Sequence, residues 1–168
     1  MAEEQVTYDV EGYEAITPAI MALINAFPGL STGETFRFST LSENGGLAMF
    51  PNNGAIIQLE RISVIGKVYQ ECLYPFFIYY RSAGLSEARK ENVKEWLDNL
   101  GRWLERQTIT INGADCVLSA YPTLTGTRKI QSITRQSPAF LSAINENKTE
   151  DWILDITLKY QNEFFRKN

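Results

Sequence analysis

The chain has 168 residues, a formal net charge of −4 and no histidine, and its composition is that of an ordinary globular protein. This length fits one domain, residues 1–168, which we expect to begin with an extended N-terminal arm over residues 1–12. Lysines and arginines are dispersed, which argues against dedicated nucleic-acid binding. The start of the chain does not resemble a signal peptide, and no stretch approaches about 20 consecutive apolar residues. We therefore expect a soluble protein made inside the cell, with no membrane partner.

The first predicted helix runs from Tyr13 to Phe27. Apolar residues recur there at intervals of three and four, and Pro28-Gly29 stops the pattern. Thr17 followed by Pro18 offers an alternative start, because proline is favoured in the first turn of a helix.

Strands are predicted next. The segment "TFRFSTL" resembles a strand, and "GGLAMFPNNGAIIQLERISV" resembles a hairpin that turns at Asn52-Asn53-Gly54. The following strand, Tyr69 to Arg81, carries large side chains on both faces. Tyr74, Phe76, Ile78 and Tyr80 point one way, whereas Leu73, Phe77 and Tyr79 point the other. A helix of the same chain can cover one face, so the strand raises the question of what covers the other.

A second helix is predicted from a Ser86 cap to about Arg106, and we expect it to be the one long helix of the fold. Its apolar stripe consists of Val93, Trp96, Leu97, Leu100, Trp103 and Leu104.

In the last third, "DWILDITLKYQNEFF" has the alternation of an antiparallel strand with Trp152, Leu154, Ile156, Leu158 and Tyr160 on one face. The preceding "QSPAFLSAINENKTE" suggests an exposed loop that holds a short strand or a helical turn. We predict an α+β fold in which an antiparallel or mixed sheet has the long helix packed on one face and the N-terminal helix nearby.

The sequence contains no motif that is typical of a catalytic site. The absence of histidine removes the Ser-His and Cys-His nucleophile pairs and most zinc sites. No glycine-rich phosphate loop is present, and Cys72 and Cys116 are interpreted as reduced core residues. Two carboxylate groups remain as alternatives for an enzyme or ligand-binding site: Glu60 with Glu71, and Asp9 with Glu11 and Glu14. The leading expectation is a protein that is not an enzyme and needs no cofactor or metal.

Arg128, Lys129 and Arg135 form the only local basic group. Such charges are typical of a solvated strand edge, where they discourage aberrant strand pairing. The more specific hypothesis is that the three residues form an interface with another subunit or with the tube of a larger assembly.

Five segments in order resemble a family of phage minor capsid proteins from viruses and prophages of Firmicutes. They are "GETFRFSTLSENGGLAMFPNNGAII", "VYQECLYPFFIYYRSAGLSE", "VKEWLDNLGRWLERQ", "YPTLTGTRKIQSITRQSPAFL" and "DWILDITLKYQNEF". The resemblance covers about Thr32 to Phe164 and includes no catalytic signature. The size and order of elements are similar to those of tail terminator proteins, which form rings at the head-proximal end of a tail tube.

The resemblance implies a structural virion protein assembled in the bacterial host cytoplasm, in a phage or a phage-tail-like particle. Its partners would be further copies of itself in a ring, with a hexamer as the expected form, the tail tube protein, and a neck or connector protein. Another head-tail joining or neck protein is the alternative within the same class, and a small carboxylate-based enzyme or ligand-binding domain is the alternative outside it.

Overall fold

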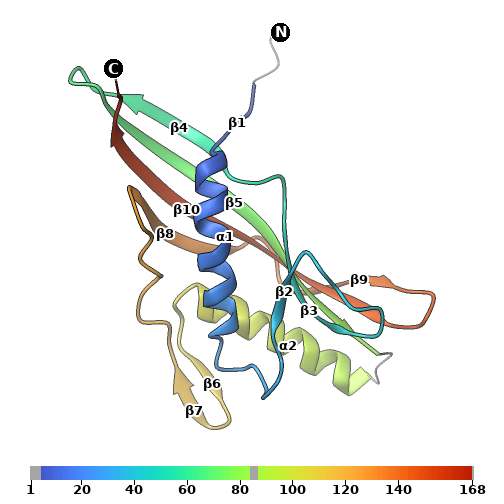
Figure 1. Cartoon of the computed structure of the whole chain (residues 1–168). Coiled ribbons are helices and arrows are strands. Elements are labelled where there is room, and N and C mark those ends of the chain that lie inside the picture. Colours follow the sequence, from blue (N-terminus) through green and yellow to red (C-terminus); the bar gives the residue numbers. More distant parts are fainter. Residues whose placement is uncertain (1–4, 84–86, 168) are drawn as a thin grey trace.

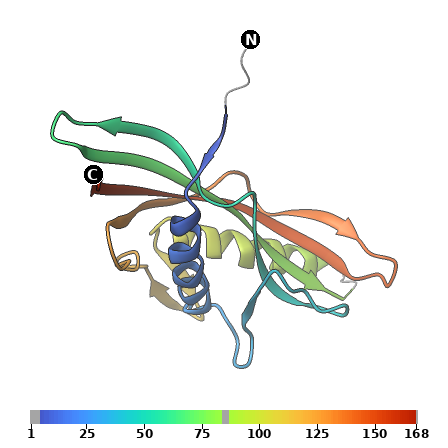
Figure 2. The same cartoon turned by 45° about the horizontal axis from the view of Figure 1, so that its top comes forward.

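The computed structural model describes residues 5–83 and 87–167, with side chains omitted for residues 87–89. Over these residues the chain forms one large sheet and two helices, which confirms the predicted α+β class. Figure 2 shows both helices on the same side of the sheet, and the small β6–β7 hairpin lies on that side too. On the opposite side, which we call the open face, no helix of the described residues covers the sheet.

The main sheet has eight strands. They are β1 (Thr7–Tyr8), β2 (Phe36–Phe38), β3 (Gly46–Pro51), β4 (Ile56–Ile62), β5 (Lys67–Ser82), β8 (Arg128–Arg135), β9 (Phe140–Ile144) and β10 (Glu150–Phe165). All pairings are antiparallel except that of β2 with β3, which is parallel. A separate two-stranded sheet is formed by β6 (Ile109–Ile111) and β7 (Ala114–Cys116).

The spine of the sheet is the pair of 16-residue strands β5 and β10, which run antiparallel along their whole length (Figure 1). Tyr74, Phe76 and Ile78 of β5 are completely buried under the helices, as the alternation predicted. The alternate residues Leu73, Phe77 and Tyr79 lie on the open face and are only partly buried. The covered face of β10 is buried as predicted, because Leu154, Ile156, Leu158 and Tyr160 have no exposed surface. The strand is not one-sided at its start, where Asp151 and Ile153 of the other face are buried too.

The predicted hairpin between β3 and β4 is wrong. Both strands pair with β5, with β3 beside Phe76–Arg81 and β4 beside Val68–Leu73, so they follow one another along the same flank. Asn53 and Gly54 do take the positive φ angles of 66° and 81° that their residue types favour. The Asn-Asn-Gly segment therefore belongs to a loop that connects two strands running in the same direction along one edge of β5.

Helix α1 spans Val10–Asn25 and begins earlier than predicted, so it takes over part of the expected arm at residues 1–12. Asp9 caps it by accepting a hydrogen bond from the Gly12 amide at 3.1 Å. Pro18 lies inside the helix and removes one backbone donor. The neighbouring Thr17 hydroxyl bonds both the Tyr13 carbonyl and the Tyr74 hydroxyl at 2.7 Å, which ties this turn to the sheet.

Helix α2 spans Glu87–Leu104, and its stripe of Val93, Leu97, Leu100, Trp103 and Leu104 is buried as predicted. It is not a single long helix, because its 18 residues barely exceed the 16 of α1. The helix ends before Arg106, which has a φ of 63°, and the Gln107 amide closes back onto the Arg102 carbonyl at 2.9 Å. The predicted Ser86 cap lies outside the described residues.

The core lies between the helices and the covered face of the sheet. Trp96 lies at its edge and donates a hydrogen bond to the Gly29 carbonyl, so α2 holds the loop that follows α1. Both cysteines are free, as expected; Cys72 is buried, which raises its pKa to about 11, whereas Cys116 is half-buried.

Candidate assembly surfaces

The three predicted basic residues do not form one surface, although all lie on β8. Arg128 binds Asp9 through two hydrogen bonds of 2.8 and 3.0 Å, and Arg135 binds Glu105 at 2.8 Å. Their side chains are only 13% and 22% exposed. Lys129 is exposed and has no acidic partner within 4 Å among the described residues. The arginines therefore fasten the helices to the sheet, and Lys129 is the member of the group that remains available to another molecule.

The contact between Arg128 and Asp9 belongs to a buried cluster at the start of α1, which we call the Asp9 clamp. The Asp9 carboxylate also accepts a hydrogen bond of 2.6 Å from the Tyr160 hydroxyl on β10 and caps α1 through Gly12. Burial alone would raise the pKa of Asp9, but the hydrogen bonds from Arg128, Tyr160 and Gly12 outweigh it and lower that pKa. All described donors near this carboxylate are thus used to hold α1 in place.

The carboxylate pairs that the sequence left open do not converge. Register places Glu60 opposite Gln70 and Glu71 opposite Leu59, and since Gln70 and Glu71 are consecutive, the two carboxylates lie on opposite faces of the sheet. Gln70 binds Glu60 at 2.7 Å, and Tyr69 binds Glu71 at 3.1 Å. The described part of the chain contains no group of three metal-ligating side chains that fits an ion.

The Asp9 group does not converge either. Glu11 and Glu14 are exposed on α1, whereas Asp9 is buried in its clamp.

The open face carries the second set of large side chains, and these form a continuous patch. Phe50 of β3 pairs with Phe77 of β5, Tyr79 of β5 pairs with Ile153 of β10, and Ile153 pairs with Phe140 of β9. The Phe50 and Tyr79 rings are 4.9 Å apart between centroids, and those of Phe77 and Tyr79 are 6.5 Å apart. We call Phe50, Phe77, Tyr79, Phe140 and Ile153 the aromatic band. None of the five residues belongs to the core under the helices.

One carboxylate lies in this apolar patch. Asp155 of β10 is directly opposite Phe77, so its side chain shares the open face with the aromatic band. No side-chain hydrogen bond or ion pair to Asp155 occurs among residues 5–83 and 90–167. Desolvation by its neighbours raises its pKa.

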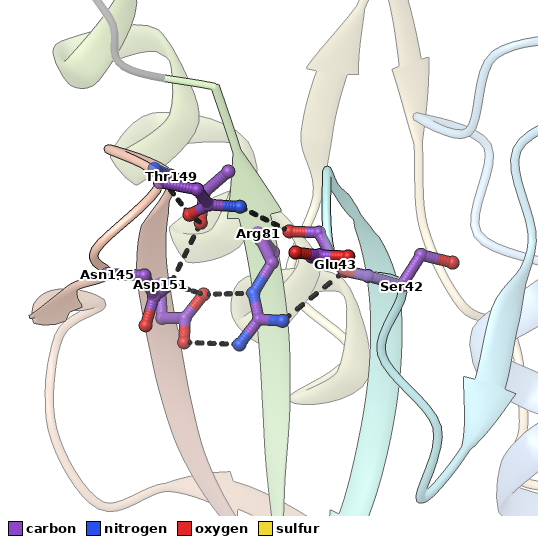
Figure 3. Close-up of polar contacts among 7 residues, drawn as sticks. Ser42, Glu43, Arg81, Asn145, Thr149 and Asp151 are labelled. Carbon is purple, nitrogen blue, oxygen red and sulfur yellow. Dashed lines mark hydrogen bonds and ion pairs between the residues drawn. The ribbon is translucent and has the colours of Figure 1, made fainter.

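One end of the aromatic band is fixed by a polar cluster (Figure 3). Arg81 donates two parallel hydrogen bonds of 2.7 and 2.9 Å to Asp151 and a third, of 3.3 Å, to the Ser42 carbonyl. The Arg81 guanidinium lowers the pKa of Asp151. Asn145 bonds Asp151 and Thr149, which fixes the turn between β9 and β10. The cluster joins three segments of the chain and gives the band a polar rim, as protein interfaces have.

The turn between β4 and β5 is the second exposed apolar feature. We call Ile62–Lys67 the hairpin tip; it projects away from the helices (Figure 1). Val64 is fully exposed and Ile65 is 75% exposed, although tight turns are normally built from polar residues. Backbone hydrogen bonds nevertheless fix the shape of the tip. The Ser63 amide donates to the Lys67 carbonyl at 2.9 Å, and the Arg166 amide donates to the Gly66 carbonyl at 3.0 Å.

The sequence prediction missed Asp155 and the hairpin tip. The doubly apolar pattern of Tyr69 to Arg81 was the signal for the aromatic band, but it named no partner for that face. For the tip, the signal was the pair of β-branched residues Val64 and Ile65 next to Gly66.

Comparison of the chain with protein-family models and with curated proteins finds no match. Within the described residues, neither helix is long and apolar enough to cross a membrane. The class defined by the geometry is therefore an α+β domain with one uncovered sheet face and a projecting apolar hairpin. Both features are surfaces suited to contact with other proteins.

Proposed function

We propose that this protein is a structural component that assembles into a ring and closes the head-proximal end of a phage or phage-tail-like tube, as tail terminators do. Its partners are other copies of the chain, the tail tube protein and a neck or connector protein. The protein acts by geometry, without a catalytic group or cofactor.

The observation that carries the proposal is the presence of two different apolar surfaces on one subunit, the aromatic band and the hairpin tip. A contact between two unlike patches is heterologous, and repetition of such a contact generates a closed ring when the rotation per subunit divides a full turn. A single self-complementary patch would instead favour a two-fold dimer.

A ring also suits the task at the end of a tube. Each subunit makes modest contacts, but a ring that matches the symmetry of the tube engages many of them at once, and the contacts then reinforce one another. The order of elements and the resemblance over Thr32 to Phe164 favour the tail terminator over other ring-forming proteins.

Electron microscopy of negatively stained samples tests the proposal directly. The purified protein is imaged alone and after mixing with purified phage tail tubes. We expect additional ring-shaped density at one end of the tubes. Val117→Asp is a suitable control, because Val117 is an exposed apolar residue outside both surfaces.

Protein that ignores the tubes but binds isolated head connectors would replace the terminator by a neck component. Protein that binds neither would contradict a role in joining head and tail.

A further inference from the structure

We infer that the hairpin tip of one subunit docks on the aromatic band of the next, where Arg61 of the first faces Asp155 of the second. The inference rests on the proposed ring, because it names the contact from which that ring is built. The partner is a second copy of this chain.

The hairpin tip has the features of an inserted element. Val64 and Ile65 present apolar side chains to solvent at the end of a hairpin that is held in shape by its own hydrogen bonds and by Arg166. A rigid apolar projection loses little conformational freedom when it is buried, so the burial yields a larger net gain. The free energy gained on binding grows with the apolar surface that a partner removes from water, so side chains as exposed as these gain most.

The aromatic band has the complementary features of a receiving surface. It is an apolar patch on the open face in which the four rings are at least partly exposed and Ile153 between them is buried, and the Arg81–Asp151 ion pair borders it on one side. On the other side lies the weaker Lys159–Glu71 contact of 3.8 Å. An apolar centre with a polar rim is the usual arrangement of a specific protein interface.

Charge complementarity identifies the occupant. The carboxylate of Asp155 lies beside the band, opposite Phe77, and has no cationic partner among the described residues of its own chain. The hairpin carries Arg61, an exposed residue that also has no ion pair among the described residues, whereas Lys67 is already paired with Glu163 at 3.2 Å. Arg61 pairs with Tyr69 in the sheet, so it lies on the open-face side of the hairpin.

The two surfaces cannot meet within one subunit. The tip leads directly into β5, whereas Phe77 and Tyr79 lie towards the far end of that strand. A strand rises about 3.4 Å per residue, which separates them by roughly 40 Å. Each tip must therefore reach a different molecule, and the contact passes from subunit to subunit in one direction.

A charge exchange tests the contact. Arg61→Asp and Asp155→Arg should each reduce the fraction of capped tubes, and the protein concentration needed for assembly should rise by roughly tenfold or more. The double variant Arg61→Asp/Asp155→Arg should recover most of this loss, because it restores the ion pair with reversed polarity. Circular dichroism and thermal melting of each variant establish that it is folded.

A crosslink provides a second readout that does not depend on the charges. In a Cys116→Ser background, Ile65→Cys with Phe77→Cys should give disulfide-linked ladders on mild oxidation, whereas either single variant should give none. Ile65→Asp should abolish assembly, and the matched control Val117→Asp should retain it.

The outcomes separate this contact from the proposed function. If wild-type protein caps tubes while the charge reversals are harmless and no ladder forms, the contact is wrong and the function stands. If ladders form and the double variant restores assembly but no tube is capped, the contact stands and the terminator role is wrong. Crosslinking of residue 65 to the tube protein instead of to residue 77 would overturn the choice of a second copy as the partner.

Discussion

At the scale of single residues, the Asp9 clamp is the most informative feature, because one carboxylate connects three distant parts of the chain. It caps α1 and binds Arg128 of β8 and Tyr160 of β10. A carboxylate with its pKa lowered in this way stabilises the fold only while it is ionised.

We predict that Asp9→Asn lowers the free energy of unfolding by about 3 kcal/mol at neutral pH, because it leaves the mostly buried Arg128 without its counter-charge. Urea unfolding measures the loss. Glu11→Gln is the matched control, since Glu11 is exposed on the same helix, and a change within about 0.5 kcal/mol is expected there. Equal effects of the two substitutions would contradict the clamp.

The same residue predicts a pH dependence. The contribution of Asp9 is complete above its ordinary pKa of 3.8 and is lost as the pH falls through the lower value of the folded state. The stability difference between wild type and Asp9→Asn should therefore shrink below about pH 4. A difference that stays constant down to pH 2 would show that packing, and not charge, is responsible.

At the scale of elements, α1 contains a residue that is unusual inside a helix. Pro18 lies in the middle of the helix and is exposed, so it removes a helical hydrogen bond without adding buried contacts.

We predict that Pro18→Ala stabilises the protein by about 1–3 kcal/mol, because alanine restores the missing donor and is the best helix former. The rise in the melting temperature measures this effect. Glu14→Ala, one turn earlier on the exposed side, is the control and should have little effect. A destabilised Pro18→Ala variant would mean that the proline ring itself makes an essential contact.

How far the elements could be predicted depends on whether their signals are local. The apolar stripe of α2 and the alternation of β5 and β10 are periodic within one segment, so burial of Leu100, Phe76 and Ile156 follows from the sequence. The Asn52–Gly54 turn also has a local signal, but that signal does not specify whether the chain reverses or continues in the same direction after the turn. The pairing of both β3 and β4 with β5 depends on distant residues and could not be foreseen.

The residues of the candidate surfaces also differ in whether a local sequence signal predicts them. The aromatic band could be suspected from β5 alone, because two apolar faces on one strand require two partners. The partner of Arg128 could not be predicted, since Asp9 is 119 positions away in sequence. For this reason the sequence does not distinguish Arg128, Lys129 and Arg135, whereas the structure separates two internal arginines from one exposed lysine.

At the scale of the whole molecule, the proposed self-assembly would make stability depend on protein concentration. Association through a contact that only the folded chain can make stabilises the fold by mass action, by about 2.7 kcal/mol when the partner exceeds its dissociation constant about a hundredfold.

We predict that the melting temperature of the wild-type protein rises by roughly 5 °C or more over about a hundredfold increase in concentration. Calorimetry over a dilution series measures the rise, which Val117→Asp should share and Ile65→Asp should lose. A melting temperature independent of concentration would show that free subunits remain monomeric and that assembly needs the tube.

The long pairing of β5 with β10 also bears on the synthesis of the protein. Residues that face each other across these strands are far apart in the chain, by 70 positions for Arg81 and Asp151 and by 92 for Gln70 and Asn162. A nascent chain therefore carries the apolar β5, complete at Ser82, without its principal neighbour until β10 begins at Glu150. Folding of the sheet is completed only after β10 has been made, and until then β5 has an unpaired apolar edge of the kind that favours misassociation of folding chains.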